Sequence, residues 1–502
     1  TACHHIGGVP LGSDKAVRSA CMHAAQKYSE YVLKLAKADL NATYKGVVFM
    51  YCARPQTMLN HFIRGVRPSL TLDAASKADD GFFAALAHAW RISSQDVSRK
   101  DPDRWGSRRQ LQLALRDGGG AFAALEQTRP AAFLGSTADT LPSLLLIPGG
   151  PAAGLVSLLQ NPLQWHGAHC PPTLHEAFAS WQNISARPTF RNMKTNKVNK
   201  HVFKALCAAS DSGSSSTALN PAFSNLSQVA GKQPQRAFAY VILDDLRGRI
   251  VQDPHLSRHA RVRIAASSRT GAGRFMIVLP GMNKQQLLLS EEQYLDNVHL
   301  RFGLPLSHRL HDADTKCNCG VRPNSFQFTQ EFFDHVLSCN KTKGTKLKRH
   351  NLILPVLQSF FEELGYEFDT SVDGCGFSNV IHAVPGQGSG RLPGDCKLDA
   401  VAHWVADRSK SWGIDVTVWH QNSQSARKNE SAASAPNADC FITRAAETSK
   451  YAKYLQLCND RGIQLLPSAF NTYGGWGEVI LKEVVHPHFN KLRDEEFEKC
   501  GQ

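Results

Sequence analysis

The feature of this sequence that most constrains its fold is a close group of cysteine and histidine residues. Cys317 and Cys319 are separated by one residue, and His335 and Cys339 follow with three residues between them, which gives the pattern C-x-C-x15-H-x3-C. Two close pairs of such ligands suit tetrahedral zinc, and Gly320 permits a tight turn after the first pair. The pattern therefore predicts a small zinc knuckle with structural Zn²⁺. The alternative is a set of unrelated thiols beside a core histidine.

A basic segment follows the cysteine–histidine group. It contains no acidic residue and consists of Lys341, Lys343, Lys346, Lys348 and Arg349. The whole chain is also basic, with 57 lysine and arginine residues against 43 acidic ones and a net charge of +14. Because a soluble chain with this charge usually binds a polyanion, the segment is predicted to contact nucleic-acid phosphates. A solvated basic loop or a nuclear-import signal is the alternative.

Two aspartates further along the chain are candidate ligands for a catalytic metal. Residues 414–419 alternate apolar and polar side chains, so Asp415 and Thr417 are predicted to share one face of a strand whose other face is buried. A charged carboxylate in such a strand is costly unless it is paired or binds a metal. With Asp395, it is predicted to hold Mg²⁺, which activates water and stabilises phosphorane charge. The alternative is that Asp395 caps a turn and Asp415 forms a structural salt bridge.

Two candidate lysines lie in a predicted helix over residues 438–459. The expected buried face of this helix consists of Phe441, Ala445, Thr448, Ala452 and Leu455. At about 100° per residue, Lys450 and Lys453 lie away from that face. They are therefore either solvated, or one of them reaches the scissile phosphate. A strand over 463–470 and a turn at 473–477 are predicted to follow.

The first part of the chain is predicted to be helical, because its apolar residues recur at three- and four-residue steps. The helical segments expected on this basis are 14–45, 58–66, 81–96 and 108–115. The serine-rich stretch 211–217 predicts a flexible linker. No signal peptide is predicted at the N-terminus, and no uncharged apolar stretch is long enough for a bilayer, so no membrane partner is expected. A start at Thr1 suggests a fragment of a larger protein.

In order and spacing, residues 317–477 resemble the restriction-like endonuclease of non-LTR retrotransposons, in which one open reading frame carries reverse transcriptase, zinc knuckle and nuclease. The matching residues are the C-C-H-C group, a basic-His-Asn element, a Pro-Asp-like element, a second carboxylate and a lysine helix: Cys317, Cys319, His335, Cys339, Arg349, His350, Asn351, Pro393, Asp395, Asp415, Lys450, Lys453 and Tyr454. The resemblance implies site roles for some of these. They are Asp395 and Asp415 as Mg²⁺ ligands, Lys450 or Lys453 as electrostatic stabiliser, and His350 and Asn351 as groups that position DNA or the metal-bound water.

The first 140 residues resemble the thumb and connection that follow the catalytic palm of such reverse transcriptases. The segments that carry this resemblance are 8–13, 51–55, 64–68, 105–119 and 131–136. The sequence contains no Y/F-x-D-D polymerase box. Asp244 and Asp245, which follow Leu243, lie downstream of the thumb-like region and are interpreted as surface acids. The chain alone is therefore not expected to polymerise.

The resemblance implies a multi-domain fold with a mostly α N-terminal thumb-like region, a small zinc knuckle and an α/β PD-(D/E)XK-like C-terminal nuclease domain. The expected boundaries are 1–175 for the thumb and connection, 176–235 for a flexible linker, 236–310 for a mixed basic linker domain, 311–345 for the knuckle and 346–502 for the nuclease. The implied function is Mg²⁺-dependent nicking of target duplex DNA in the nucleus. The free 3′ hydroxyl would then prime reverse transcription of element RNA.

Several residues depart from the family pattern. Gly394 separates Pro393 from Asp395, the distance from Asp395 to Asp415 exceeds the usual gap, and Thr417 stands where a lysine is usual. Asn471 stands where many relatives have an acid. Two alternatives to a nuclease therefore stay open. One is a catalytically degenerate zinc-dependent nucleic-acid-binding module, and the other is a domesticated structural protein.

Overall fold

The computed structural model of the chain describes residues 4–6, 9–93, 105–145, 234–256, 258–268, 271–276, 289–304, 316–322, 329–339, 341, 343–370, 398–407, 411–420, 441–460 and 462–487. The chain divides into two compact units. The first comprises residues 1–257 and 275–304, and the second comprises 258–274 and 305–502. The segment 236–310, expected as a separate basic domain, is divided between these two units.

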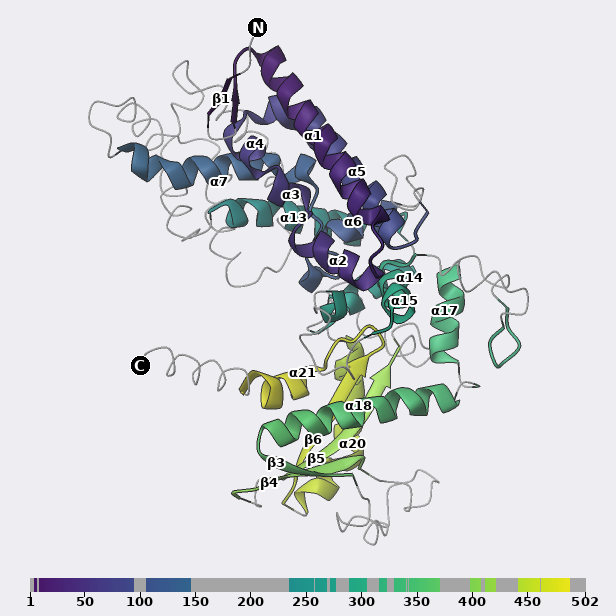
Figure 1. The fold of residues 1–502 in the computed structure, drawn as a ribbon. Helices are drawn as coiled ribbons and strands as arrows, with labels where there is room; N and C mark the ends of the chain where they lie inside the picture. The colour runs from purple at the N-terminus through teal and green to yellow at the C-terminus, as the bar shows by residue number, and fades with distance from the viewer. Residues whose placement is uncertain are drawn as a thin grey trace. The chain divides into compact units, whose positions relative to one another are not determined.

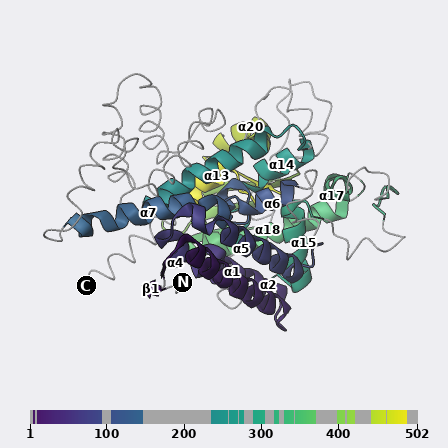
Figure 2. The ribbon, with the colours of Figure 1, turned by 90° about the horizontal axis from the view of Figure 1, so that it is seen from above.

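The first unit is built from helices and one short hairpin (Figure 1). Its strands are β1 His4–Ile6 and β2 Val9–Leu11, and its helices are α1 Asp14–Lys37, α2 Ala42–Tyr51, α3 Pro55–Met58, α4 Asn60–Gly65, α5 Pro68–Ala89, α6 Trp105–Gln112, α7 Leu125–Leu145, α13 Pro234–Gln252 and α15 Glu291–Phe302. The expected helical character of this part of the chain is confirmed. Helices α1 and α5 lie side by side, and so do α7 and α13, as Figure 2 also shows.

The single helix expected over residues 14–45 is two helices, and their capping residues explain why. Ser13 begins α1 by accepting a hydrogen bond from the backbone N–H of Ala16. The chain leaves the helix at Ala38, and Asn41 then begins α2 by accepting from the N–H of Thr43. Asparagine is a strong N-cap residue because its side chain replaces a missing backbone acceptor. The apolar residues thus recur at helical spacing across the segment between α1 and α2, although the helix itself is interrupted there.

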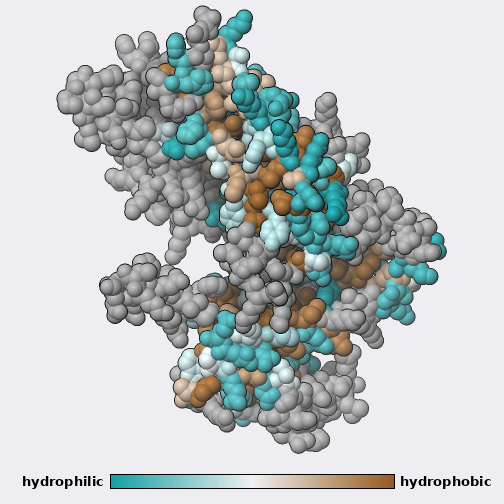
Figure 3. All heavy atoms as spheres, viewed as in Figure 1, coloured by the Kyte–Doolittle hydropathy of each residue, from teal (hydrophilic) through white to brown (hydrophobic). Residues whose placement is uncertain are grey.

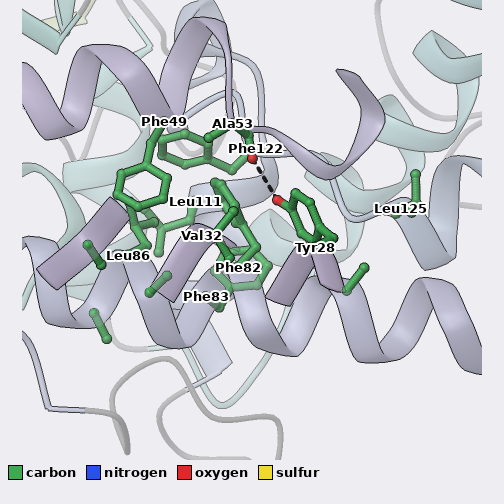
Figure 4. Packing of buried hydrophobic residues seen from close by; sticks show 14 of the residues in the cluster. Tyr28, Val32, Phe49, Ala53, Phe82, Phe83, Leu86, Leu111, Phe122 and Leu125 are labelled. Carbon is green, nitrogen blue, oxygen red and sulfur yellow. Dashed lines mark hydrogen bonds between the residues drawn. The ribbon is translucent and has the colours of Figure 1, made fainter. Parts of the chain in front are cut away.

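The core of the first unit lies where α1, α2 and α5 meet (Figure 4). Phe82 packs edge-on against both Phe49 and Phe83, with ring centroids 5.6 Å apart in each case. The hydroxyl of buried Tyr28 donates to the carbonyl of Ala53 at 2.6 Å, so its polar group is satisfied inside the core. The outer side of α1 is hydrophilic in Figure 3 and carries the exposed residues Lys15, Lys27, Lys34 and Lys37.

The interpretation of Asp244 and Asp245 as surface acids was wrong. Both are buried in α13. Asp245 forms an ion pair with Arg249 at 3.0 Å, and burial raises the pKa of Asp244 to about 6. The arginine one turn after Asp245 offsets part of the cost of burying that carboxyl group, which a reading of polarity alone does not reveal.

The second unit contains a four-stranded mixed sheet and several helices (Figure 1). Its elements are α14 Arg258–Ser267, α17 Thr329–Ser338, α18 Lys343–Glu363, β3 Tyr366–Asp369, β4 Ala400–Trp404, β5 Ser411–Trp419, α20 Phe441–Asn459, β6 Gln464–Asn471, α21 Glu478–Ile480 and a π-helical turn Leu481–Val485. Strand order in the sheet follows chain order. Strands β3, β4 and β5 pair antiparallel, and β6 pairs parallel to β5 because α20 returns the chain to the other end of the sheet.

The two faces of this sheet are covered differently. Ile414 and Val416 of β5 face the apolar core under α18, together with Leu357 and Phe361 of that helix. Strand alternation then puts Asp415 on the opposite face, which α20 covers. The predicted strand and its buried valine face are therefore confirmed. Gly413, on the α20 face, is tightly enclosed, because an added Cβ would lie 2.8 Å from Leu398.

The helix and strand predicted after residue 438 are confirmed, but the predicted buried face of the helix was wrong. The buried residues of α20 are Thr443, Ala446, Glu447, Tyr454 and Cys458. The expected face included Thr448, Ala452 and Leu455, which are exposed. The prediction sought an entirely apolar stripe. The inward face instead carries polar groups with partners, such as Glu447, which accepts a hydrogen bond from the backbone N–H of Val479.

Among the described helices, none is long and apolar enough to cross a membrane.

Candidate functional site

Asp415 lies at the centre of the polar site on the α20 face of the sheet. Its side chain is only 4 % exposed, and Lys450 of α20 places its Nζ 2.5 Å from Oδ1. Burial raises the pKa of Asp415 above its ordinary value, and Lys450 opposes that rise. A carboxylate this buried needs a positive partner to stay charged, and here the partner is a lysine. Of the two candidate lysines, the structure therefore brings Lys450 to the site.

Asp399, which the sequence analysis did not select, is the second carboxylate of the site. Asp399 directly precedes β4, whose first residue Ala400 pairs with Ile414, and its charge interacts with that of Asp415. The backbone N–H of Asp399 donates to the carbonyl of Ile414 at 2.9 Å. Its Oδ2 in turn accepts from the N–H of Val416 at 2.6 Å. Asp399 thus binds the residues on both sides of Asp415, and its charge contributes to the raised pKa of Asp415.

His350 of α18 completes this group of polar side chains. Its Nε2 lies 2.9 Å from Oδ2 of Asp399, and its Nδ1 lies 3.1 Å from Oδ1 of Asn351. The hydrogen bond to Asp399 raises the pKa of His350, which favours the protonated imidazolium. The predicted His-Asn element is therefore beside a carboxylate, and that carboxylate is Asp399. We refer to Asp399, Asp415, Lys450 and His350 as the carboxylate site.

Of the other predicted residues, Tyr454 hydrogen-bonds Asp415, and the rest lie apart from this group or outside the described part of the chain. Asp395 falls within 371–397 and lies outside the described residues. The Nζ of Lys453 donates to the phenol of Tyr454 at 2.7 Å. Thr417 pairs with Ala469 of β6. A signal for Asp399 was present in the sequence, since it directly precedes an apolar run that becomes β4, but only its bonds to Ile414 and Val416 place it beside Asp415.

Asn471, which replaces an acid in the family pattern, has a structural role. Its Oδ1 accepts from the backbone N–H groups of Tyr473 and Gly475, and its Nδ2 donates to the carbonyl of Ala266 at 3.0 Å. A carboxylate at this position would lack the donor for Ala266. The amide therefore stabilises the turn after β6 and attaches it to α14.

The cysteine–histidine group forms a second candidate site, as the spacing predicted. The ligand atoms of Cys317, Cys319, His335 and Cys339 all lie within 4.8 Å of one another. Gly320, with a φ of +89°, turns the chain after the first pair, and its N–H donates to the carbonyl of Cys317 at 2.7 Å. Among the described residues, these four form the cluster that can hold a metal ion such as zinc. We call it the Cys/His cluster.

The thiols of the Cys/His cluster differ in their acidity. The backbone N–H of Val321 lowers the pKa of Cys319 to about 6, and the hydrogen bond with His335, whose Nε2 lies 3.1 Å from the sulfur, acts in the same direction. Burial raises the pKa of Cys317 to about 11. Metal ligands must be thiolates, so Cys319 is prepared to bind a cation at neutral pH, whereas Cys317 releases its proton when a metal binds.

The predicted basic segment becomes the first turns of α18, which begins at Lys343. Lys341 precedes the helix and is exposed. Arg349 is different, because its guanidinium is partly buried and donates to the carbonyl of Leu337 in α17 at 2.9 Å. Burial lowers the pKa of Arg349. The structure therefore gives Arg349 a contact within the protein, in addition to the phosphate contact predicted for it.

Comparison of the chain with protein-family models gave no match, and comparison with curated proteins gave none either. Its function is therefore inferred from the geometry of the carboxylate site and the Cys/His cluster.

Proposed function

We propose that the second unit is a metal-dependent DNA endonuclease with a PD-(D/E)XK-like fold. The observation that carries this proposal is the meeting of Asp399, which directly precedes β4, with Asp415 of β5, with Lys450 bound to Asp415 and His350 to Asp399. Such a group combines hard oxygen ligands with fixed positive charge. These are the components that phosphodiester hydrolysis requires.

The carboxylate site suits Mg²⁺ by the chemistry of its donors. Two neighbouring carboxylates repel each other, and a divalent cation between them removes that repulsion. Asp399 and Asp415 would hold the ion, which lowers the pKa of a bound water and polarises a phosphate oxygen. Lys450 would stabilise the negative charge that develops on the phosphate, and His350 holds Asp399 in its orientation.

The Cys/His cluster and the basic residues of α18 support a role in holding nucleic acid. Three thiols and one imidazole are the ligand set of structural zinc sites. Zn²⁺ bound there would fix the loop at Cys317 against α17 and present the basic start of α18 beside it. Phosphate contacts from Lys341, Lys343, Lys346 and Lys348 would position duplex DNA or element RNA without reading its sequence.

The cellular role rests on the resemblance to retrotransposon proteins. In that setting the nuclease nicks target DNA in the nucleus, and the new 3′ hydroxyl primes reverse transcription by a polymerase palm that this chain does not carry. The helical first unit would correspond to the thumb and connection.

Nicking of supercoiled plasmid with Mg²⁺ tests the proposal. Wild-type protein is expected to give open circles, and Asp415→Asn and Asp399→Asn are expected to abolish them while DNA binding persists. Asp395→Asn decides whether the residue selected from the sequence also contributes. Asp460→Asn is the matched control, because Asp460 is an exposed aspartate at the end of α20 whose Oδ1 accepts a hydrogen bond from Gln456.

A negative result would have a definite meaning. If wild-type protein with zinc bound and DNA affinity intact nicks no substrate with Mg²⁺ or Mn²⁺, the nuclease proposal fails. The zinc-dependent binding module then becomes the function that the remaining observations support.

A further inference from the structure

A buried polar network joins the helix of the Cys/His cluster to the end of β5. Asp334 lies directly before the cluster residue His335 on α17, and both Asp334 and His420 are almost fully buried. The Nε2 of His420 lies 3.1 Å from Oδ1 of Asp334. On its other side, Nδ1 of His420 lies 2.7 Å from the hydroxyl of Thr472. One imidazole therefore connects α17 with the residues that follow β5 and β6.

The same network extends to α14. Arg263 is buried there, and its charge interacts with Asp334 and with the phenol of Tyr473. The rings of His420 and Tyr473 pack at 6.3 Å. A buried carboxylate that meets both an imidazole and a guanidinium is held in one position, because any displacement would leave a charge without its partner.

A second connection leads from α17 to the other carboxylate. Arg349 of α18 donates to the carbonyl of Leu337 at the C-terminal end of α17. The next residue of α18 is His350, which holds Asp399 at 2.9 Å. Helix α17 is thus attached to both halves of the carboxylate site. One attachment passes through His420 to the strand of Asp415, and the other passes through Arg349 to His350 and Asp399.

We infer that α17 is a positioning element for the carboxylate site, and that His420 and Arg349 transmit its position. This inference rests on the proposed function for its consequence in catalysis. A metal bound at the Cys/His cluster would fix α17 through His335 and through Cys339, the residue that follows the helix, so metal occupancy at that cluster would influence how rigidly Asp399 and Asp415 are held. The cluster then does more than bind nucleic acid, since it is part of what builds the nuclease site.

The arrangement of strands explains why a small shift would matter. Asp399 is bonded to both neighbours of Asp415, Ile414 and Val416, so the two carboxylates are held by the same stretch of β5. Loss of the His420 contact or of the Arg349 contact would therefore change the positions of both proposed Mg²⁺ ligands, Asp399 and Asp415. Loss of groups that orient metal ligands costs about 10- to 100-fold in metal affinity or activity.

Hydrogen–deuterium exchange of the full chain tests the coupling without any need for activity. Chelation of zinc is expected to speed exchange in residues 411–420 by about tenfold, because the end of β5 loses its support. His420→Phe keeps the ring and removes both hydrogen bonds, and Arg349→Met keeps the stem and removes the donor. In zinc-loaded His420→Phe, residues 411–420 should already exchange quickly, and chelation should add little. Gln358→Met, at a partly exposed position of α18, is the control.

Kinetics separate positioning from simple loss of stability. Below the melting temperature, His420→Phe and Arg349→Met should raise the Mg²⁺ concentration that gives half-maximal nicking and lower kcat by about 10- to 100-fold. KM for DNA should change little in His420→Phe, whereas Arg349→Met also removes the predicted phosphate contact and should raise it. A variant that was only less stable would keep the wild-type Mg²⁺ dependence.

The outcomes distinguish this inference from the proposed function. If chelation speeds exchange in 316–339 and leaves 411–420 unchanged, the coupling is refuted, whatever the protein does to DNA. If exchange shows the coupling and wild-type protein nicks no DNA, the positioning role of α17 stands and the nuclease proposal fails.

Discussion

Replacement of Lys450 by methionine is the perturbation that most directly tests the carboxylate site. Methionine keeps the length and packing of the side chain and removes the ammonium that lies 2.5 Å from Asp415. Asp415 is then a buried carboxylate without its main positive partner. We expect a large loss of stability that depends on pH.

The magnitude follows from the burial of the two side chains. Removing one partner of a buried ion pair costs about 3–5 kcal/mol. The Lys450 side chain is 23 % exposed, so part of its charge is already solvated, and the lower end of the range applies, about 3 kcal/mol at pH 8. The double variant Lys450→Met/Asp415→Asn should recover most of this loss, because no buried charge remains.

The sign of the pH dependence follows from the raised pKa of Asp415. A carboxyl group whose pKa is higher in the folded protein favours folding while it is protonated, and that contribution is lost as pH rises through the folded-state pKa. Lys450→Met raises that pKa further. The difference between variant and wild type should therefore be small below the ordinary value of 3.8 and should grow toward neutral pH, by at most about 1.4 kcal/mol per pH unit.

Chemical denaturation of zinc-loaded protein without Mg²⁺, at pH 5 and pH 8, measures the loss of stability in Lys450→Met and how that loss depends on pH. Lys453→Met is the control, because its ammonium bonds Tyr454 and reaches Asp415 only through that phenol, and it should change stability by about 0.5 kcal/mol or less. In the nicking assay Lys450→Met should lower kcat by about 100-fold with DNA affinity nearly unchanged. Equal losses for the two lysine variants, or a Lys450→Met loss that does not vary with pH, would refute the reasoning.

Three further predictions concern the rest of the chain. One equivalent of zinc should co-purify, and Cys319→Ser should release it and make the 311–345 region sensitive to protease; metal analysis of folded protein without zinc would contradict this. Joint replacement of Lys343, Lys346 and Lys348 by alanine should flatten the log–log salt dependence of DNA binding by about 0.9 for each phosphate that the variant no longer neutralises, and an unchanged slope would place the binding surface elsewhere. Tyr28→Phe should lower the free energy of unfolding of the first unit by about 1 kcal/mol in a denaturant titration, since the carbonyl of Ala53 is left without its donor; no change would show that this bond contributes nothing net.

The helical first unit and the strand of Asp415 could be predicted because each depends on a local pattern. Apolar periodicity predicted the helical character of the first unit, although α5 begins at Pro68 and not near residue 81. Strict alternation predicted that Ile414 and Val416 turn inward while Asp415 faces the other way. The Cys/His cluster was likewise evident, because its spacing alone brings four ligands within reach of one ion. Asp244 shows the limit of such patterns, since charge suggested exposure and burial beside partners was the outcome.

Other features of the carboxylate site were decided by the tertiary structure. The sequence placed Asp395 and Asp415 in one site, and Asp395 lies outside the described residues. The structure adds Asp399, which is bonded to both neighbours of Asp415, and that contact depends on two segments together. The sequence could not choose between Lys450 and Lys453, because the choice depends on which side of α20 meets the sheet. That side carries Glu447 and Lys450, so an apolar stripe was the wrong criterion for it.

The sequence by itself thus determined the types of secondary structure, the metal-binding pattern of the Cys/His cluster and the face of β5 that carries Asp415. Each of these follows from residues close together in the chain, where backbone geometry fixes what a given spacing can do. The tertiary structure decided that Asp399, Lys450 and His350 meet around Asp415, and that α17 is attached to both halves of that site. Those contacts join residues far apart in the chain, and they are set by packing and strand pairing, which no local pattern encodes.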